Sequence, residues 1–109
     1  MFAWFDCSEV DAFVDGIIAD LVKRLPPERV ELPGKKATER LRKTHDSIFR
    51  RVDAYASSVR LNLYKKAHLG NRFLWALKEA GYPEEFVDAL THELVTAVTL
   101  ASRRRNAPS

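Results

Sequence analysis

Apolar residues recur at helical spacing in several parts of the chain, and the first of these stretches has no interruption. Its apolar positions follow the i, i+3, i+4, i+7 rule; they are Val10, Phe13, Val14, Ile17, Ile18, Leu21, Val22 and Leu25. Ser8 can serve as the N-cap, and Pro26-Pro27 should end the helix because proline cannot donate a backbone hydrogen bond. The pattern predicts an amphipathic helix up to Leu25, followed by an extended connector over residues 26–34.

A much longer stretch follows the connector. From Lys35 to about Ala67 there is no glycine or proline, so nothing in the composition stops a helix. Apolar residues and one histidine alternate at spacings of four and three, as in a coiled-coil seam; they are Leu41, His45, Ile48, Val52, Tyr55 and Val59. If unbroken, this helix would be roughly 48 Å long, which exceeds the helices that could pack on it. It must therefore bend or be covered by something else.

Glycine marks two further positions where helices can end. Gly70-Asn71 offers a break and an N-cap for a short third helix, although continuation of the long helix through Gly70 stays open. The segment 81–85, GYPEE, places a helix-ending glycine before a proline and two carboxylates that suit a first turn. A last helix is predicted from Pro83 to about Arg104, and residues 106–109 are expected to fray.

The absence of strand-like alternation, together with these stretches, predicts an all-α fold. We expect a small bundle of about four helices with one long central helix. A chain of 109 residues is long enough to fold as one domain, residues 1–109, without disulfide or metal staples. The single cysteine, Cys7, excludes an internal disulfide and paired-cysteine zinc or redox frameworks.

The first seven residues, MFAWFDC, are unusually apolar and aromatic. They lack a basic leader, so they are not expected to be a signal peptide, and no stretch reaches the roughly 18 apolar residues of a membrane span. These features predict a cytoplasmic location and no membrane association. The aromatic segment is expected to dock on the chain's own core or to meet a partner.

Charge is distributed unevenly along the chain. Residues 35–72 contain 11 Lys and Arg against 3 Asp and Glu, whereas residues 1–34 contain 3 against 7. On the long helix the spacing of basic residues predicts one ridge with a flanking arginine; the residues are Lys36, Arg40, Lys43, Arg50 and Arg51. Such a ridge can bind nucleic-acid phosphates or an acidic protein. The plainer interpretation is a solvated face, in which Glu39 pairs with Lys43, Asp46 pairs with Arg42 and Arg50, and acidic residues of the first helix neutralise the rest.

Chemistry-bearing motifs are missing from the sequence. His68 and His92 have no companion at i+3 or i+4 that would start a helical metal site. There is no glycine-rich phosphate loop, no nucleophile elbow and no close carboxylate pair in an apolar setting. We therefore predict no catalytic residue, no metal site and no cofactor.

The overlong helix and the aromatic start motivate the leading functional hypothesis. It is a non-enzymatic helical protein–protein interaction module that forms a homodimer through one stripe of the long helix. The predicted interface residues are Leu41, His45, Ile48 and Val52. The alternative hypothesis is a nucleic-acid-binding protein that uses the basic ridge.

Overall fold

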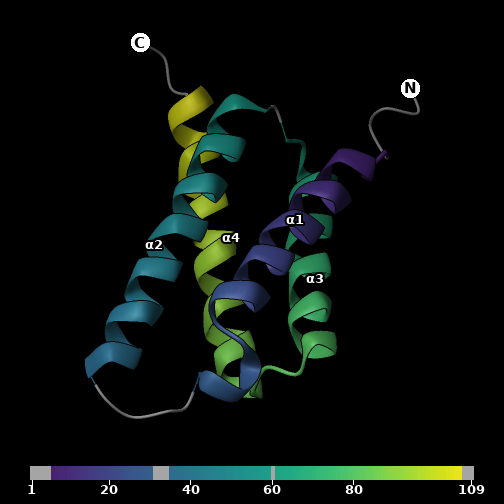
Figure 1. Ribbon diagram of the computed structural model, residues 1–109. Coiled ribbons are helices and arrows are strands. Elements are labelled where there is room, and N and C mark those ends of the chain that lie inside the picture. The colour runs from purple at the N-terminus through teal and green to yellow at the C-terminus, as the bar shows by residue number, and fades with distance from the viewer. Residues whose placement is uncertain (1–5, 31–34, 60, 107–109) are drawn as a thin grey trace.

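Within the described residues the chain forms four α-helices and no strand (Figure 1). The computed structural model describes residues 6–30, 35–59 and 61–106, without the side chains of residues 35–37 and 104–106. The helices are α1 (Ser8–Arg24), α2 (Lys35–Ser58), α3 (Leu63–Ala80) and α4 (Glu84–Asn106), with a short 3₁₀ helix, η2 (Pro27–Arg29), after α1. The prediction of a small all-α bundle is confirmed. Most of the aromatic first segment and the end of the predicted frayed tail lie outside the described residues.

Each helix has two main neighbours in the bundle. α1 packs against α2 and α3, and α4 packs against the same two helices. Figure 1 shows α2 and α3 on either side, with α1 crossing in front of α4. The order around the bundle is therefore α1, α2, α4, α3, so the α1–α2 face and the α3–α4 face lie on opposite sides of the molecule.

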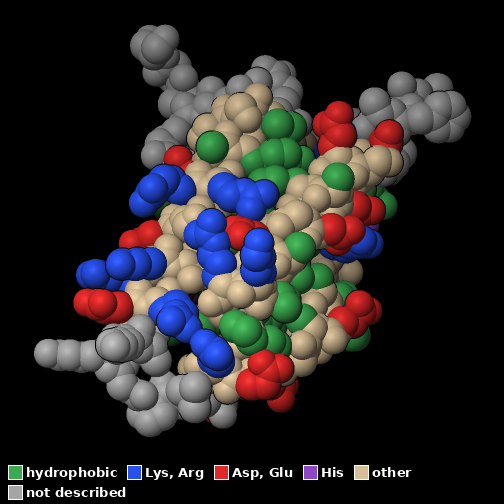
Figure 2. Space-filling model, in the orientation of Figure 1, with side chains coloured by type: hydrophobic (Ala, Val, Ile, Leu, Met, Phe, Trp, Pro, Cys, Tyr) green, Lys and Arg blue, Asp and Glu red, His purple; other side chains and the backbone are tan. Residues whose placement is uncertain are grey.

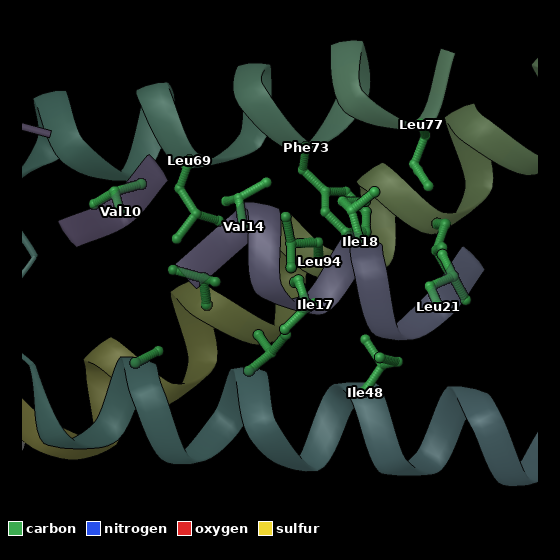
Figure 3. Packing of buried hydrophobic residues seen from close by; sticks show 14 of the residues in the cluster. Val10, Val14, Ile17, Ile18, Leu21, Ile48, Leu69, Phe73, Leu77 and Leu94 are labelled. Atoms are coloured by element: carbon green, nitrogen blue, oxygen red, sulfur yellow. The ribbon is translucent and has the colours of Figure 1, made fainter. Parts of the chain in front are cut away.

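The core lies where the apolar stripes of the four helices meet (Figure 3). Ile17, Ile48, Phe73 and Leu94 come from α1, α2, α3 and α4 in turn, and each is at most 1% exposed. Full burial of one such side chain contributes about 1.5–3 kcal/mol. The interior is apolar where these four side chains meet. The buried face of α1 is therefore continuous, and helical periodicity alone was enough to predict this helix.

The long stretch expected between Lys35 and Ala67 is divided into two helices. α2 ends at Ser58 and α3 begins at Leu63, so the break comes earlier than Gly70-Asn71. The side-chain oxygen of Asn62 accepts a hydrogen bond of 2.7 Å from the backbone N–H of Lys65 and caps α3. Asparagine can therefore start a helix here without any glycine or proline nearby.

Gly70 has a packing role inside α3. It is buried, and a Cβ atom built on it would lie 3.1 Å from a methyl carbon of Val95 on α4. A glycine at this position lets α3 and α4 approach closely, which is why it occurs in a helix interior despite its low helix propensity.

The start of α1 is capped differently from the prediction. Cys7 occupies the N-cap position and makes no side-chain cap bond. Instead a carboxylate oxygen of Asp6 accepts hydrogen bonds from the backbone N–H of Ser8 at 2.9 Å and from its hydroxyl at 2.6 Å. These bonds hold the pKa of Asp6 below its usual value. At the other end α1 stops before Pro26, as predicted, but the connector contains η2 and is not fully extended.

The turn between α3 and α4 matches the prediction. Gly81 adopts a left-handed conformation with φ 98°, and its N–H bonds to the last turn of α3. Next to it, the hydroxyl of the buried Tyr82 donates a 2.6 Å hydrogen bond to the backbone oxygen of Leu25. The same turn that ends α3 is thereby attached to the end of α1.

Candidate functional site

The basic residues predicted to form a ridge are exposed on α2. Arg40, Lys43, Arg50 and Arg51 all face solvent, whereas the side chain of Lys36 lies outside the described part of the chain. In Figure 2 basic side chains gather over α2 and along its seam with α1, while acidic side chains gather mainly on the other side of α1. The helical spacing predicted this exposure, whereas the binding role of these residues stays a prediction.

The end of α1 adds an arginine that the sequence analysis did not include. Arg24, Arg40 and Lys43 line an open hollow of about 450 Å³ together with Glu39 and Thr44. We call this site the basic hollow, and we call the wider set of Arg24, Arg40, Lys43, Arg50 and Arg51 the basic surface. No signal in the sequence links Arg24 to α2, because their proximity depends on how the two helices pack.

Asp20 of α1 orients two of these arginines. Its carboxylate lies 3.0 Å from Nε of Arg24 and 3.4 Å from a terminal nitrogen of Arg51. Another nitrogen of Arg24, Nη1, donates a 3.0 Å hydrogen bond to the hydroxyl of Ser47 on α2. Arg24 is therefore held across the seam between α1 and α2.

The remaining cations of the basic surface are not neutralised by neighbouring carboxylates. Among the described residues Arg40, Lys43 and Arg50 form no ion pair. The expected pair between Glu39 and Lys43 is not formed, and Asp46 lies 3.7 Å from His45 and not beside an arginine. Three cations of the basic surface thus have no described carboxylate within ion-pair distance, whereas Asp20 of α1 partly neutralises Arg24 and Arg51, as the interpretation of a solvated face predicted.

The residues predicted to form a dimer interface divide into two groups. Ile48 is 1% exposed and Val52 is fully buried, so both already pack inside the chain and present no surface to a second copy. Leu41 and His45 are half-buried at the edge between α2 and α4. His45 contacts the carboxylate of Glu93 and stacks on Phe49, with ring centroids 4.5 Å apart. The apolar stripe predicted on α2 is present, and its main role is to form part of the core.

Exposed apolar side chains occur instead on α3 and α4. Each is at least 43% exposed, and they are Leu63, Tyr64, Trp75, Val95 and Leu100. Leu63, Leu74 and Val95 line a groove of about 420 Å³ between the two helices. This α3–α4 groove was not predicted from the sequence, although a signal existed: Val95 lies off the apolar stripe of the last helix that runs through Leu94 and Val98.

A polar network joins α1 to α3 on a third side of the bundle. His68 lies 2.7 Å from Asp11, and Arg72 makes a two-pronged contact with Asp15 at 2.9 and 3.0 Å. Nearby, burial raises the pKa of the Cys7 thiol, and the charge of Asp11 raises it further, which disfavours a reactive thiolate. The network connects two helices and holds no activated nucleophile.

Across the described residues, no cluster of three or more His, Cys, Asp or Glu side chains is arranged to hold a metal ion. None of the helices in that part of the chain is long and apolar enough to cross a membrane. Comparison of the chain with protein-family models, with curated proteins and with solved structures finds no match. The basic surface and the α3–α4 groove are two candidate sites, and Leu41 and His45 line a further open hollow of about 450 Å³ between α2 and α4.

Proposed function

We propose that this protein is a non-enzymatic helical interaction module that self-associates through the α3–α4 groove. The observation that carries the proposal is the position of the exposed apolar side chains, which lie on α3 and α4. Of these side chains, Leu63 and Val95 line the groove together with the half-buried Leu74, and an exposed apolar groove of this kind is typical of interaction sites. The groove replaces the α2 stripe as the predicted interface, because Ile48 and Val52 are occupied inside the chain.

In the proposed dimer a second copy of the chain would pack on the groove in a two-fold arrangement. In such an arrangement the same patch is used twice, so Leu63 and Val95 of one copy would pack against the same groove of the other.

The experiment is the mass of the protein in solution, measured by light scattering after size exclusion over a range of concentrations. The native chain is expected to be a dimer, and Val95→Asp a monomer, because a buried unpaired carboxylate opposes association. Leu100→Asp is the matched control: Leu100 lies on the same helix and is 52% exposed, against 47% for Val95, but it does not line the groove. A native monomer at every concentration, or equal effects of the two variants, would overturn the proposal.

The basic surface favours a second candidate function, the binding of nucleic acid. The specific observation is that Arg40, Lys43 and Arg50 are exposed on one helix and form no ion pair with a described carboxylate. Lys and Arg that contact phosphates release counterions, so the affinity should fall steeply with salt. Fluorescence anisotropy with single-stranded and double-stranded oligonucleotides over a salt series tests this candidate. Affinity that does not depend on salt would exclude it.

A further inference from the structure

The basic hollow combines side chains from two helices around one open volume. Arg24 reaches it from the end of α1, and Arg40 and Lys43 reach it from α2. We propose that this hollow is a binding site for a phosphate group, either on a polynucleotide backbone or on a small phosphorylated molecule. The inference rests on the second candidate function but assigns it a defined site, and the two can fail separately.

The types of side chain in the hollow suit a phosphate. A guanidinium presents several N–H donors in a planar fork that matches the oxygens of a phosphate, and a lysine supplies a compact positive charge. The volume of about 450 Å³ falls within the range of small-ligand sites and exceeds a bare phosphate ion, which leaves room for the group that carries the phosphate. An apolar helix would instead bury these charges unpaired, so a protein partner of that kind is disfavoured.

Arg24 is positioned before any ligand arrives. Its Nε lies 3.0 Å from Asp20 and its Nη1 donates to the hydroxyl of Ser47, so two of its three nitrogens are fixed. Its remaining nitrogen, Nη2, takes part in neither contact. Because the side chain is already ordered by these two contacts, less conformational entropy is lost when the phosphate binds.

Glu39 is the one acidic residue among the described residues that line the hollow. Its carboxylate repels a bare phosphate but can accept a hydrogen bond from a hydroxyl of the group that carries it. Neutralising it with Glu39→Gln should therefore strengthen the binding of inorganic phosphate a few-fold, as expected for a partly screened charge.

The test is an NMR titration of the intact chain with inorganic phosphate, with chloride at matched ionic strength as the reference. Perturbations are expected at the side-chain Nε–H of Arg24 and Arg40. The double variant Arg40→Gln/Lys43→Gln should bind phosphate at least about 10-fold more weakly, the effect of losing one hydrogen bond to a charged group. Arg42→Gln/Lys78→Gln is the matched control, since both side chains are exposed and neither lines the hollow.

Oligonucleotide binding by the same variants separates the two sources of phosphate. If Arg40→Gln/Lys43→Gln loses the binding of both inorganic phosphate and oligonucleotide, and the control variant keeps both, the result supports a site for a backbone phosphate. Phosphate binding in the hollow without any oligonucleotide binding supports the site for a small phosphorylated molecule and overturns the nucleic-acid function. Oligonucleotide binding that falls equally in both variants, or no response of Arg24 and Arg40 to phosphate, overturns the proposed site.

Discussion

Tyr82 shows how a single side chain can join distant parts of this fold. Its ring is buried and stacks on Phe86 with ring centroids 5.0 Å apart, while its hydroxyl donates to the backbone oxygen of Leu25. Burial is the main reason that the pKa of Tyr82 is raised to about 12, with a smaller contribution from the charge of Glu28. The fold therefore favours the protonated phenol over the phenolate.

Replacing Tyr82 with Phe should lower the free energy of unfolding by about 1–2 kcal/mol at neutral pH, since the oxygen of Leu25 loses its donor. Between about pH 10 and 12 the unfolded chain loses the phenol proton while the folded chain keeps it, so stability falls as the pH rises. Tyr82→Phe has no phenol proton to lose, so its stability does not fall for this reason. The difference in the free energy of unfolding between the native protein and Tyr82→Phe should therefore narrow between about pH 10 and 12. Urea unfolding followed by circular dichroism measures the free energy of unfolding of the two proteins at each pH. If the difference between them stayed constant, the folded protein would not retain the phenol proton of Tyr82.

At the scale of elements, the boundaries of the helices depend on local capping as much as on periodicity. The apolar pattern continues from α2 into α3, yet the chain turns between Ser58 and Leu63, where Asn62 caps the next helix. Asn71 was an equally suitable cap in the sequence, but it lies inside α3, because the adjacent Gly70 is needed for contact with α4. Two candidate caps with the same chemistry are thus distinguished only by packing.

Substitution of the two asparagines by alanine tests which of them starts α3. Asn62→Ala should destabilise the protein by about 1 kcal/mol, the usual effect of losing an N-cap. Asn71→Ala replaces an exposed residue inside a helix with a better helix former and should be neutral or slightly stabilising. Thermal unfolding of both variants at one low concentration is the measurement. A greater loss for Asn71→Ala would place the break at Gly70-Asn71 in solution.

At the scale of the whole molecule, the order α1, α2, α4, α3 separates two kinds of surface. The basic surface lies on α2 and the end of α1, and the α3–α4 groove lies on the opposite side. A dimer formed through the groove would leave both basic surfaces accessible, so the two proposed functions are compatible. Between these faces the core holds Ile48, which was expected to meet a partner.

Ile48→Ala distinguishes a core role from an interface role. A cavity at this fully buried site should lower the free energy of unfolding by about 2–5 kcal/mol. The mass of the folded fraction should stay the same as that of the native protein. Leu41→Ala, at a half-buried site on the same helix, is the control and should cost less. If Ile48→Ala changed the mass with little loss of stability, Ile48 would lie at an interface after all.

Features that depend on neighbours along the chain could be predicted from the amino-acid sequence. The apolar period of α1, the stop before Pro26 and the left-handed turn at Gly81 could all be predicted, because they follow from backbone geometry and local hydrogen bonding. The exposed basic residues of α2 were also predictable, since helical spacing places them on one side.

Which surfaces remain exposed to solvent depends on how the four helices pack together. Helical periodicity gives each helix an apolar stripe but does not say which neighbour covers it, so it could not show that Ile48 is occupied while Val95 is exposed. For the same reason it could not place Arg24 beside Arg40, because the packing of α1 on α2 forms the basic hollow. Contacts between residues far apart in sequence depend on the whole set of helices packing together, and that information is absent from any local pattern.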